Sequence, residues 1–194
     1  MKTWERYLEA ELSYLEEIRK TQGESIMQAA ELLAECTIND GIIRVFGTGH
    51  SHLIADDVFY RASTLGNVQA ILEETATGNK EIQKAGYVEK LEGYAPLIVD
   101  YHQIAPPDVA IVISNTGNNP MGIDFADACR ERKVPVIVLT NTAFSQILPA
   151  RHSKGKRLMD CGDVVISNCS AIGDAAVELE GLPMKVGSDR KSVV

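Results

Sequence analysis

The chain has 194 residues and is 45% hydrophobic, which is enough apolar material for one folded domain with a sizeable core. Its formal net charge of −8 argues against nucleic-acid binding, because affinity for a phosphate backbone depends on clustered Lys and Arg. The sequence contains neither a run of 18 apolar residues nor an apolar segment near its N-terminus. We therefore expect a cytoplasmic protein that does not contact a membrane.

The cysteines point to neither disulfides nor a metal centre. They lie at positions 36, 129, 161 and 169, without a C-x-x-C pair. Because free Cys is among the most buried residue types, we expect reduced thiols packed in the core. The sequence therefore predicts a protein without a bound metal.

The first 40 residues predict two amphipathic helices. Apolar residues recur at helical spacing over residues 3–20, beginning with Trp4, and a second helical pattern covers residues 24–38. Gly23 separates the two patterns, which predicts a helical hairpin over residues 1–40. Because a monomer would expose the apolar stripe, we expect the hairpin to lie in a subunit interface.

From residue 41 onward, short apolar runs alternate with helical patterns. The expected strands are residues 42–46, 68–72, 109–113, 136–139 and 164–166. Helices are expected at residues 51–64, 87–102 and 120–132, and a polar loop at residues 73–80. Continuous Val/Ile runs are typical of parallel strands buried on both faces. Residues 41–194 are thus predicted to form a doubly wound α/β domain with strand order 2-1-3-4-5.

Polar loops follow the two strands that flank the predicted switch point of this sheet. The candidate binding residues are Gly47, Thr48, Gly49 and Ser51 in the first loop, and Ser114, Asn115, Thr116, Gly117, Asn118 and Asn119 in the second. Glycines permit close backbone approach, and a helix N-terminus behind each loop favours an anion. Ordinary strand-to-helix turns are the alternative. A dinucleotide site is a weaker one, because His52 replaces the third Gly of G-x-G-x-x-G.

These two loops resemble the motifs of the SIS (sugar isomerase) domain family. Ile42–Ser51 is similar to the first motif of that family, and Val112–Pro120 to its second, S-x-[ST]-G-x-[ST], with Asn119 at the last hydroxyl position. The triplet His50-Ser51-His52 further resembles a bacterial subgroup of phosphoheptose isomerase-like proteins. The resemblance implies a homodimer or homotetramer that binds a phosphorylated sugar between the loops, without a cofactor. It also implies a closing helix after the fifth strand, and the polar end of this chain predicts that this helix is truncated or changed.

The fold alone does not choose among the activities of the family. An aldose–ketose isomerase needs a base and a group that polarises a carbonyl, and the candidates are Glu73 or Glu74 with His50 or His52. In phosphoheptose isomerases a Glu on the helix after the first loop moves the proton, but Arg61 stands near that position here. A phosphosugar sensor without catalysis and an etherase acting on an amino-sugar phosphate remain the alternatives.

Overall fold

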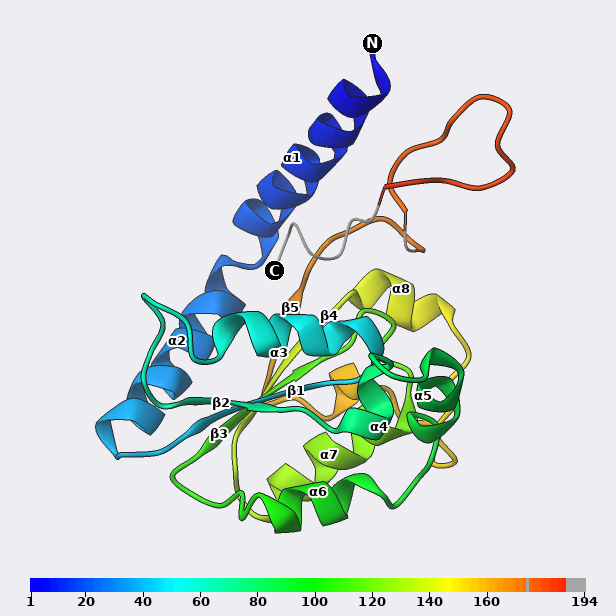
Figure 1. Cartoon of the computed structure of the whole chain (residues 1–194). Coiled ribbons are helices and arrows are strands. Elements are labelled where there is room, and N and C mark those ends of the chain that lie inside the picture. The colour runs from blue at the N-terminus through cyan, green and yellow to red at the C-terminus, as the bar shows by residue number, and fades with distance from the viewer. Residues whose placement is uncertain (174, 188–194) are drawn as a thin grey trace.

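The computed structural model describes residues 1–173 and 175–187. Five parallel strands form one sheet in the order β2-β1-β3-β4-β5, which confirms the predicted fold class and strand order (Figure 1). The strands are β1 (Ile43–Gly47), β2 (Val68–Ile71), β3 (Val109–Ile113), β4 (Val136–Thr140) and β5 (Val164–Ser167). The order reverses between β1 and β3, so both carboxyl ends open at the switch point.

Helices cover both faces of the sheet (Figure 1). One face carries α2 (Gly23–Ile38) and α3 (His52–Val58), and the other carries α6 (Ala95–Tyr101) and α7 (Pro120–Glu131). Short helices lie near the carboxyl ends of the strands: η1 (Gly49–Ser51), α4 (Glu74–Thr77), α5 (Ile82–Val88) and α8 (Thr142–Ile147). The short helix η2 (Leu158–Asp160) packs against α7 and β4.

Alternate residues of the strands enter two separate cores. Val45 and its neighbours at every second position pack under α2 and α3. Phe46 points to the opposite face, where its ring stacks on Phe125 of α7 with centroids 4.1 Å apart. Each such fully buried side chain stabilises the fold by ~1.5–3 kcal/mol. Because the side chains of a strand alternate between the two faces of the sheet, each strand packs against the helical layers on both sides.

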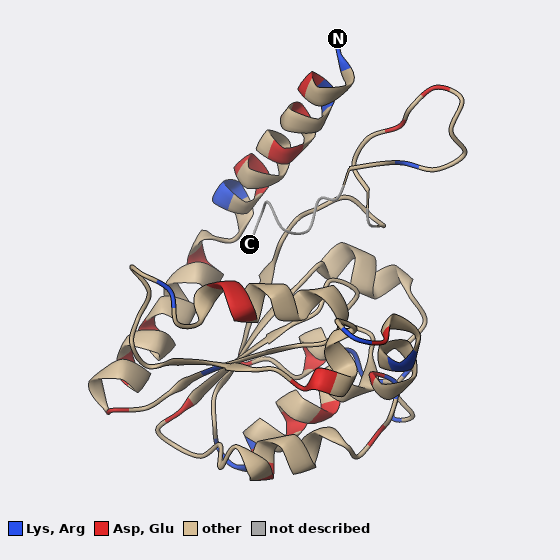
Figure 2. Ribbon diagram, viewed as in Figure 1, with Lys and Arg blue, Asp and Glu red and all other residues tan. Residues whose placement is uncertain are grey.

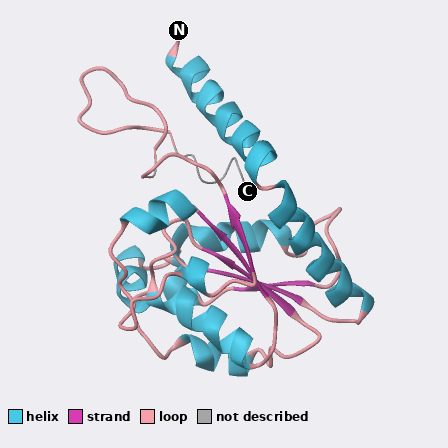
Figure 3. Cartoon of the chain, turned by 180° about the vertical axis from the view of Figure 1, so that it is seen from behind, coloured by secondary structure: helices cyan, strands magenta, loops and turns pink. Residues whose placement is uncertain are grey.

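The two N-terminal helices are present, but the predicted hairpin is wrong. The helix α1 (Thr3–Thr21) runs end to end with α2 and projects away from the sheet in both views (Figures 1 and 3). Backbone bonds of the helical type continue through the bend, from Gln22 N–H to Ile18 O (2.8 Å) and from Ile26 N–H to Gln22 O (2.9 Å). Gly23 therefore sits inside a bent helix, not in a reversing turn.

Two other predicted helices are shorter than the sequence suggested. The expected helix 51–64 ends at Val58, because the backbone becomes extended at Phe59 and left-handed at Tyr60. The expected helix 87–102 is divided into α5 and α6, and Gly93 adopts a left-handed conformation between them. The polar segment 73–80 contains the one-turn helix α4.

The C-terminal part of the described chain forms a loop beside α1. Val177 and Val186 form an isolated antiparallel bridge, and Arg6 donates from Nη2 to the backbone oxygen of Glu178 at 2.6 Å. Acidic residues lie along α1 (Figure 2), and its exposed apolar residues include Trp4 and Leu8. The polar end at 188–194, where a truncated or changed closing helix is expected, lies outside the described residues. Among the residues that the structure describes, no helix is both long and apolar enough to cross a bilayer.

Candidate functional site

A cavity of about 320 Å³ opens at the carboxyl ends of β1 and β3, and we call it the switch-point cavity. The loop after β1 and the loop after β3 form two of its walls, and α5 with the residue that follows it forms the third. Its lining consists of Thr48, Gly49, His50, Ser51, Ile82, Ala85, Gly86, Glu89, Ser114, Asn115, Thr116 and Asn119. Both loops that the sequence singled out thus meet at one site.

The loop after β1 turns tightly because its first residue is glycine. A Cβ atom on Gly47 would lie 2.9 Å from the backbone C and O atoms of Ser51, closer than real side chains allow. The Ser51 amide donates to Thr48 O at 3.1 Å, which closes the turn. Gly47 itself does not line the cavity. It allows the tight turn that brings the segment from Thr48 to Ser51 into the cavity lining.

The conformation of the loop after β3 also depends on a glycine. Gly117 has φ +57°, and its N–H donates to Ser114 Oγ at 3.1 Å, which leaves the hydroxyl hydrogen of Ser114 available. The N–H groups of Thr116, Asn118 and Asn119 donate to no acceptor within residues 1–173 and 175–187. Unpaired donors gathered just before the 12-residue helix α7 are suited to an anion.

The two asparagines of this loop have different surroundings. Asn118 does not line the cavity; its Nδ2 donates to Pro149 O at 2.6 Å and its Oδ1 accepts from Arg151 N at 3.0 Å. Asn115 lines the cavity, and its Oδ1 accepts from Asn168 Nδ2 at 3.0 Å. The Nδ2 atom of Asn115 is buried and has no hydrogen-bond partner in the described part of the chain. An unsatisfied buried donor in a cavity wall calls for a partner such as a ligand or a water.

A basic loop borders the entrance on the side of α7. Arg151 donates from Nη1 to Asn119 Oδ1 at 3.2 Å. The next residue, His152, is buried and lies 2.9 Å from Asp124 Oδ1, while Lys154 N–H donates to its Nδ1 at 3.1 Å. A neutral imidazole with its proton on Nε2 satisfies both contacts. The ring therefore anchors the loop to α7 and leaves the Arg151 guanidinium near the cavity.

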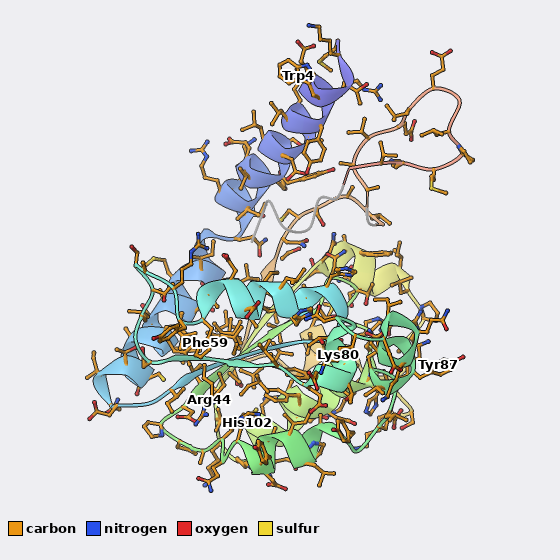
Figure 4. The ribbon with its side chains drawn as sticks, viewed as in Figure 1. Trp4, Arg44, Phe59, Lys80, Tyr87 and His102 are labelled. Carbon is orange, nitrogen blue, oxygen red and sulfur yellow. The ribbon has the colours of Figure 1, made fainter. Side chains whose placement is uncertain are left out.

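Of the four residues predicted to be catalytic, the structure brings one to the cavity wall. His50 lines the cavity. His52 is buried outside the lining, with Nδ1 in contact with Gly49 O and with no described partner for Nε2. Glu73 caps α4 and accepts from Thr75 Oγ1 at 2.6 Å, and Glu74 pairs with Lys80 while 68% exposed. Lys80 lies beside α4 in Figure 4. The glutamates are thus not in the lining, because the chain turns into α4 directly after β2.

Glu89 is a cavity residue that sequence reasoning missed. It follows α5, and its Oε2 accepts a hydrogen bond from Thr48 Oγ1 at 3.3 Å. Its backbone oxygen accepts from Met121 N–H, in the first turn of α7, at 3.2 Å. Burial raises the pKa of the Glu89 carboxyl, against opposing effects of Thr48, Lys90 and Arg151. In the sequence, Glu89 lies in a segment whose pattern predicts one regular helix over residues 87–102. Nothing in that pattern indicates that its side chain lines a cavity.

Within the part of the chain that the structure describes, no three His, Cys, Asp or Glu side chains are grouped as a metal would require. The lining instead combines hydroxyl groups, amide donors, one carboxylate and one imidazole. Such a set can bind an anionic polyol and move a proton on it.

Comparisons with known proteins give one matching family and several similar proteins. The family model described as SIS domain matches residues 6–141. The UPF0309 protein lmo0025 of Listeria monocytogenes is 43% identical over 171 residues, which cover 88% of this chain and 69% of that protein. The phosphoheptose isomerase GmhA of Neisseria gonorrhoeae has 26% identity and a TM-score of 0.59, with 81% of this chain and 80% of that chain covered. A phosphoheptose isomerase of Francisella tularensis has 18% identity and a TM-score of 0.63, with 89% and 88% covered.

Proposed function

Because the chain belongs to the SIS domain family, we propose that it binds a phosphorylated sugar in the switch-point cavity and interconverts its aldose and ketose forms. The observation that carries the proposal is that Thr116 and Asn119, whose N–H groups have no acceptor within the described chain, line the same cavity as a carboxylate and an imidazole. The likeness to the phosphoheptose isomerase GmhA supports the same class of substrate. The proposal needs neither a metal nor an organic cofactor.

The phosphate group is assigned to the loop after β3. Ser114 and Thr116 donate through their hydroxyl groups, and the free N–H groups of Thr116 and Asn119 complete the cradle. Ser51 contributes from the opposite loop. Each hydrogen bond to a charged phosphate oxygen contributes ~1.5–3 kcal/mol. Arg151 adds positive charge at the rim.

The sugar then extends from the phosphate toward the loop after β1. Isomerisation moves one proton between neighbouring carbons, while the carbonyl oxygen develops negative charge. His50 lies on this wall of the cavity and is the proposed donor to that oxygen. An imidazole suits the role because its ring N–H can donate to an oxygen that develops negative charge.

Ligand-induced stabilisation tests the binding half of the proposal. Pentose 5-phosphates, hexose 6-phosphates and heptose 7-phosphates are compared with the matching free sugars and with inorganic phosphate by thermal shift. We expect at least one sugar phosphate to raise the melting temperature and its free sugar to leave it unchanged. Equal responses to a sugar phosphate and its free sugar would contradict the assignment of a phosphate site.

A double variant then locates the phosphate. Ser114→Ala with Thr116→Ala removes two hydroxyl donors, so the affinity for the stabilising sugar phosphate should fall at least ~100-fold. Ser13→Ala with Ser25→Ala, on α1 and α2, removes two hydroxyl groups outside the cavity and should bind normally. Undiminished affinity in the first variant would overturn the cradle. Tight binding without any proton exchange on the sugar would favour a phosphosugar sensor over an isomerase.

A further inference from the structure

Glu89 is the one carboxylate among the described residues that line the switch-point cavity. Its position is fixed from two sides, since Thr48 donates to its Oε2 and Met121 donates to its backbone oxygen. The first contact ties it to the loop after β1, and the second ties it to the helix behind the loop after β3. The loop after β1 thus holds the side chain of Glu89 and the start of α7 holds its backbone, which fixes this residue in the lining of the cavity.

We propose that Glu89 is the acid/base group of this site: its carboxylate takes the proton from the sugar carbon beside the carbonyl and returns it to the neighbouring carbon. This inference rests on the proposed isomerase function and assigns its base. It replaces Glu73 and Glu74 in that role, because the first bonds to Thr75 and the second pairs with Lys80.

The proton transfer balances with groups that line the cavity. The C2–H bond of an aldose phosphate breaks, its proton passes to Glu89, and its electron pair forms the C1–C2 double bond of an enediolate. The former carbonyl oxygen takes the displaced pair and receives a proton from His50. The hydroxyl on C2 then returns its proton to His50 and becomes the new carbonyl, while C1 takes the proton back from Glu89.

The surroundings of Glu89 suit a group that must both accept and release a proton. Burial raises the pKa of its carboxyl and outweighs the charges of Lys90 and Arg151 and the hydrogen bond from Thr48. A carboxyl with a raised pKa is a stronger base once ionised, and it returns the proton at neutral pH. Its negative charge also repels phosphate, which places the phosphate at the loop after β3 and the carbonyl end of the sugar near Thr48.

Glu89→Gln tests the assignment, because it keeps the shape of the side chain and removes the titrating oxygen. The sugar phosphate that most stabilises the protein is incubated in heavy water, and deuterium incorporation at C2 is followed by NMR. We expect exchange and turnover to fall ~100- to 10,000-fold, with the dissociation constant changed only a few-fold. Glu73→Gln and Glu74→Gln serve as matched controls and should retain the exchange rate of the unmodified protein.

The pH profile gives a second readout that a structural role would not move. The ionised form of Glu89, which is the base, is lost as pH falls through its raised pKa. We therefore expect kcat/KM to decline at a pH above the range in which an ordinary glutamate becomes protonated. The residual activity of Glu89→Gln should not show this decline at low pH. Glu89→Asp should restore part of the rate and should still show the decline.

The outcomes separate the two proposals. Full exchange in Glu89→Gln, or its loss in Glu73→Gln or Glu74→Gln alone, overturns the role of Glu89 and leaves the isomerase intact. If the unmodified protein binds a sugar phosphate and exchanges no proton on any of the panel, the isomerase fails and the role of Glu89 fails with it. If no sugar phosphate binds at all, the phosphate cradle is refuted as well.

Discussion

Gly117→Ala would test how the cradle loop is built. Gly117 has φ +57°, and a Cβ atom there would lie 2.8 Å from Thr140 Oγ1 and 2.9 Å from Ser145 Oγ. Both hydroxyl side chains are almost fully buried, so neither has room to move aside. The left-handed backbone costs about 1–2 kcal/mol for a residue with a side chain, and the overpacking costs about 1–3 kcal/mol more. We expect a loss of ~2–5 kcal/mol in the free energy of unfolding.

Gly155→Ala is the matched control. Gly155 has φ +68°, and no atom of the described chain lies within 4 Å of the position that a Cβ would take, so alanine there meets the backbone strain without the clash. The free energy of unfolding of both variants is measured with urea. The difference between them gives the cost of the clash alone, which we expect to be ~1–3 kcal/mol. Affinity for a stabilising sugar phosphate should fall at least ~10-fold in Gly117→Ala alone, since its loop must shift. Equal stability and equal affinity in the two variants would refute the reasoning.

Two further predictions concern surfaces away from the cavity. We propose that a second copy of the chain covers the apolar stripe on α1, where Trp4 is 59% and Leu12 is 63% exposed (Figure 4). Leu8→Glu with Leu12→Glu should lower the mass measured by light scattering to that of a monomer. A monomeric unmodified protein would contradict this proposal. Burial raises the pKa of Cys129 and Cys161 to about 12, so iodoacetamide at neutral pH should label the half-exposed Cys169 first, as mass spectrometry would show. Labelling of all three at one rate would speak against this packing.

The sheet was predictable because its signal is local. Each strand is a continuous β-branched run such as 109–113, and each of the two cavity loops is a short run of Gly, Ser, Thr and Asn directly after a strand. The order 2-1-3-4-5 was predicted because it is a common order of doubly wound α/β sheets. The structure places the predicted residues from Thr48 to Ser51 and at Ser114, Asn115, Thr116 and Asn119 in the lining of one cavity, and their binding of a sugar phosphate stays a prediction.

The remainder of the site depends on contacts between distant segments. Glu89 enters the cavity because α5 packs beside η1 and because its backbone oxygen binds the start of α7 at Met121. No spacing in the sequence distinguishes its carboxylate from that of Glu92, which binds Ser153 at the surface. The direction of α1 was equally hidden, because a glycine such as Gly23 fits either a turn or a bent helix.

Amide chemical shifts would test the central claim most directly. The protein labelled with ¹⁵N is titrated with the sugar phosphate that stabilises it most, and the amide resonances of the two cavity-lining residues Thr116 and Asn119 are followed. Because these N–H groups have no acceptor within the described chain, they should move downfield together and saturate with one dissociation constant. Unchanged resonances at both positions while the sugar phosphate saturates the protein would contradict the phosphate site on the loop after β3.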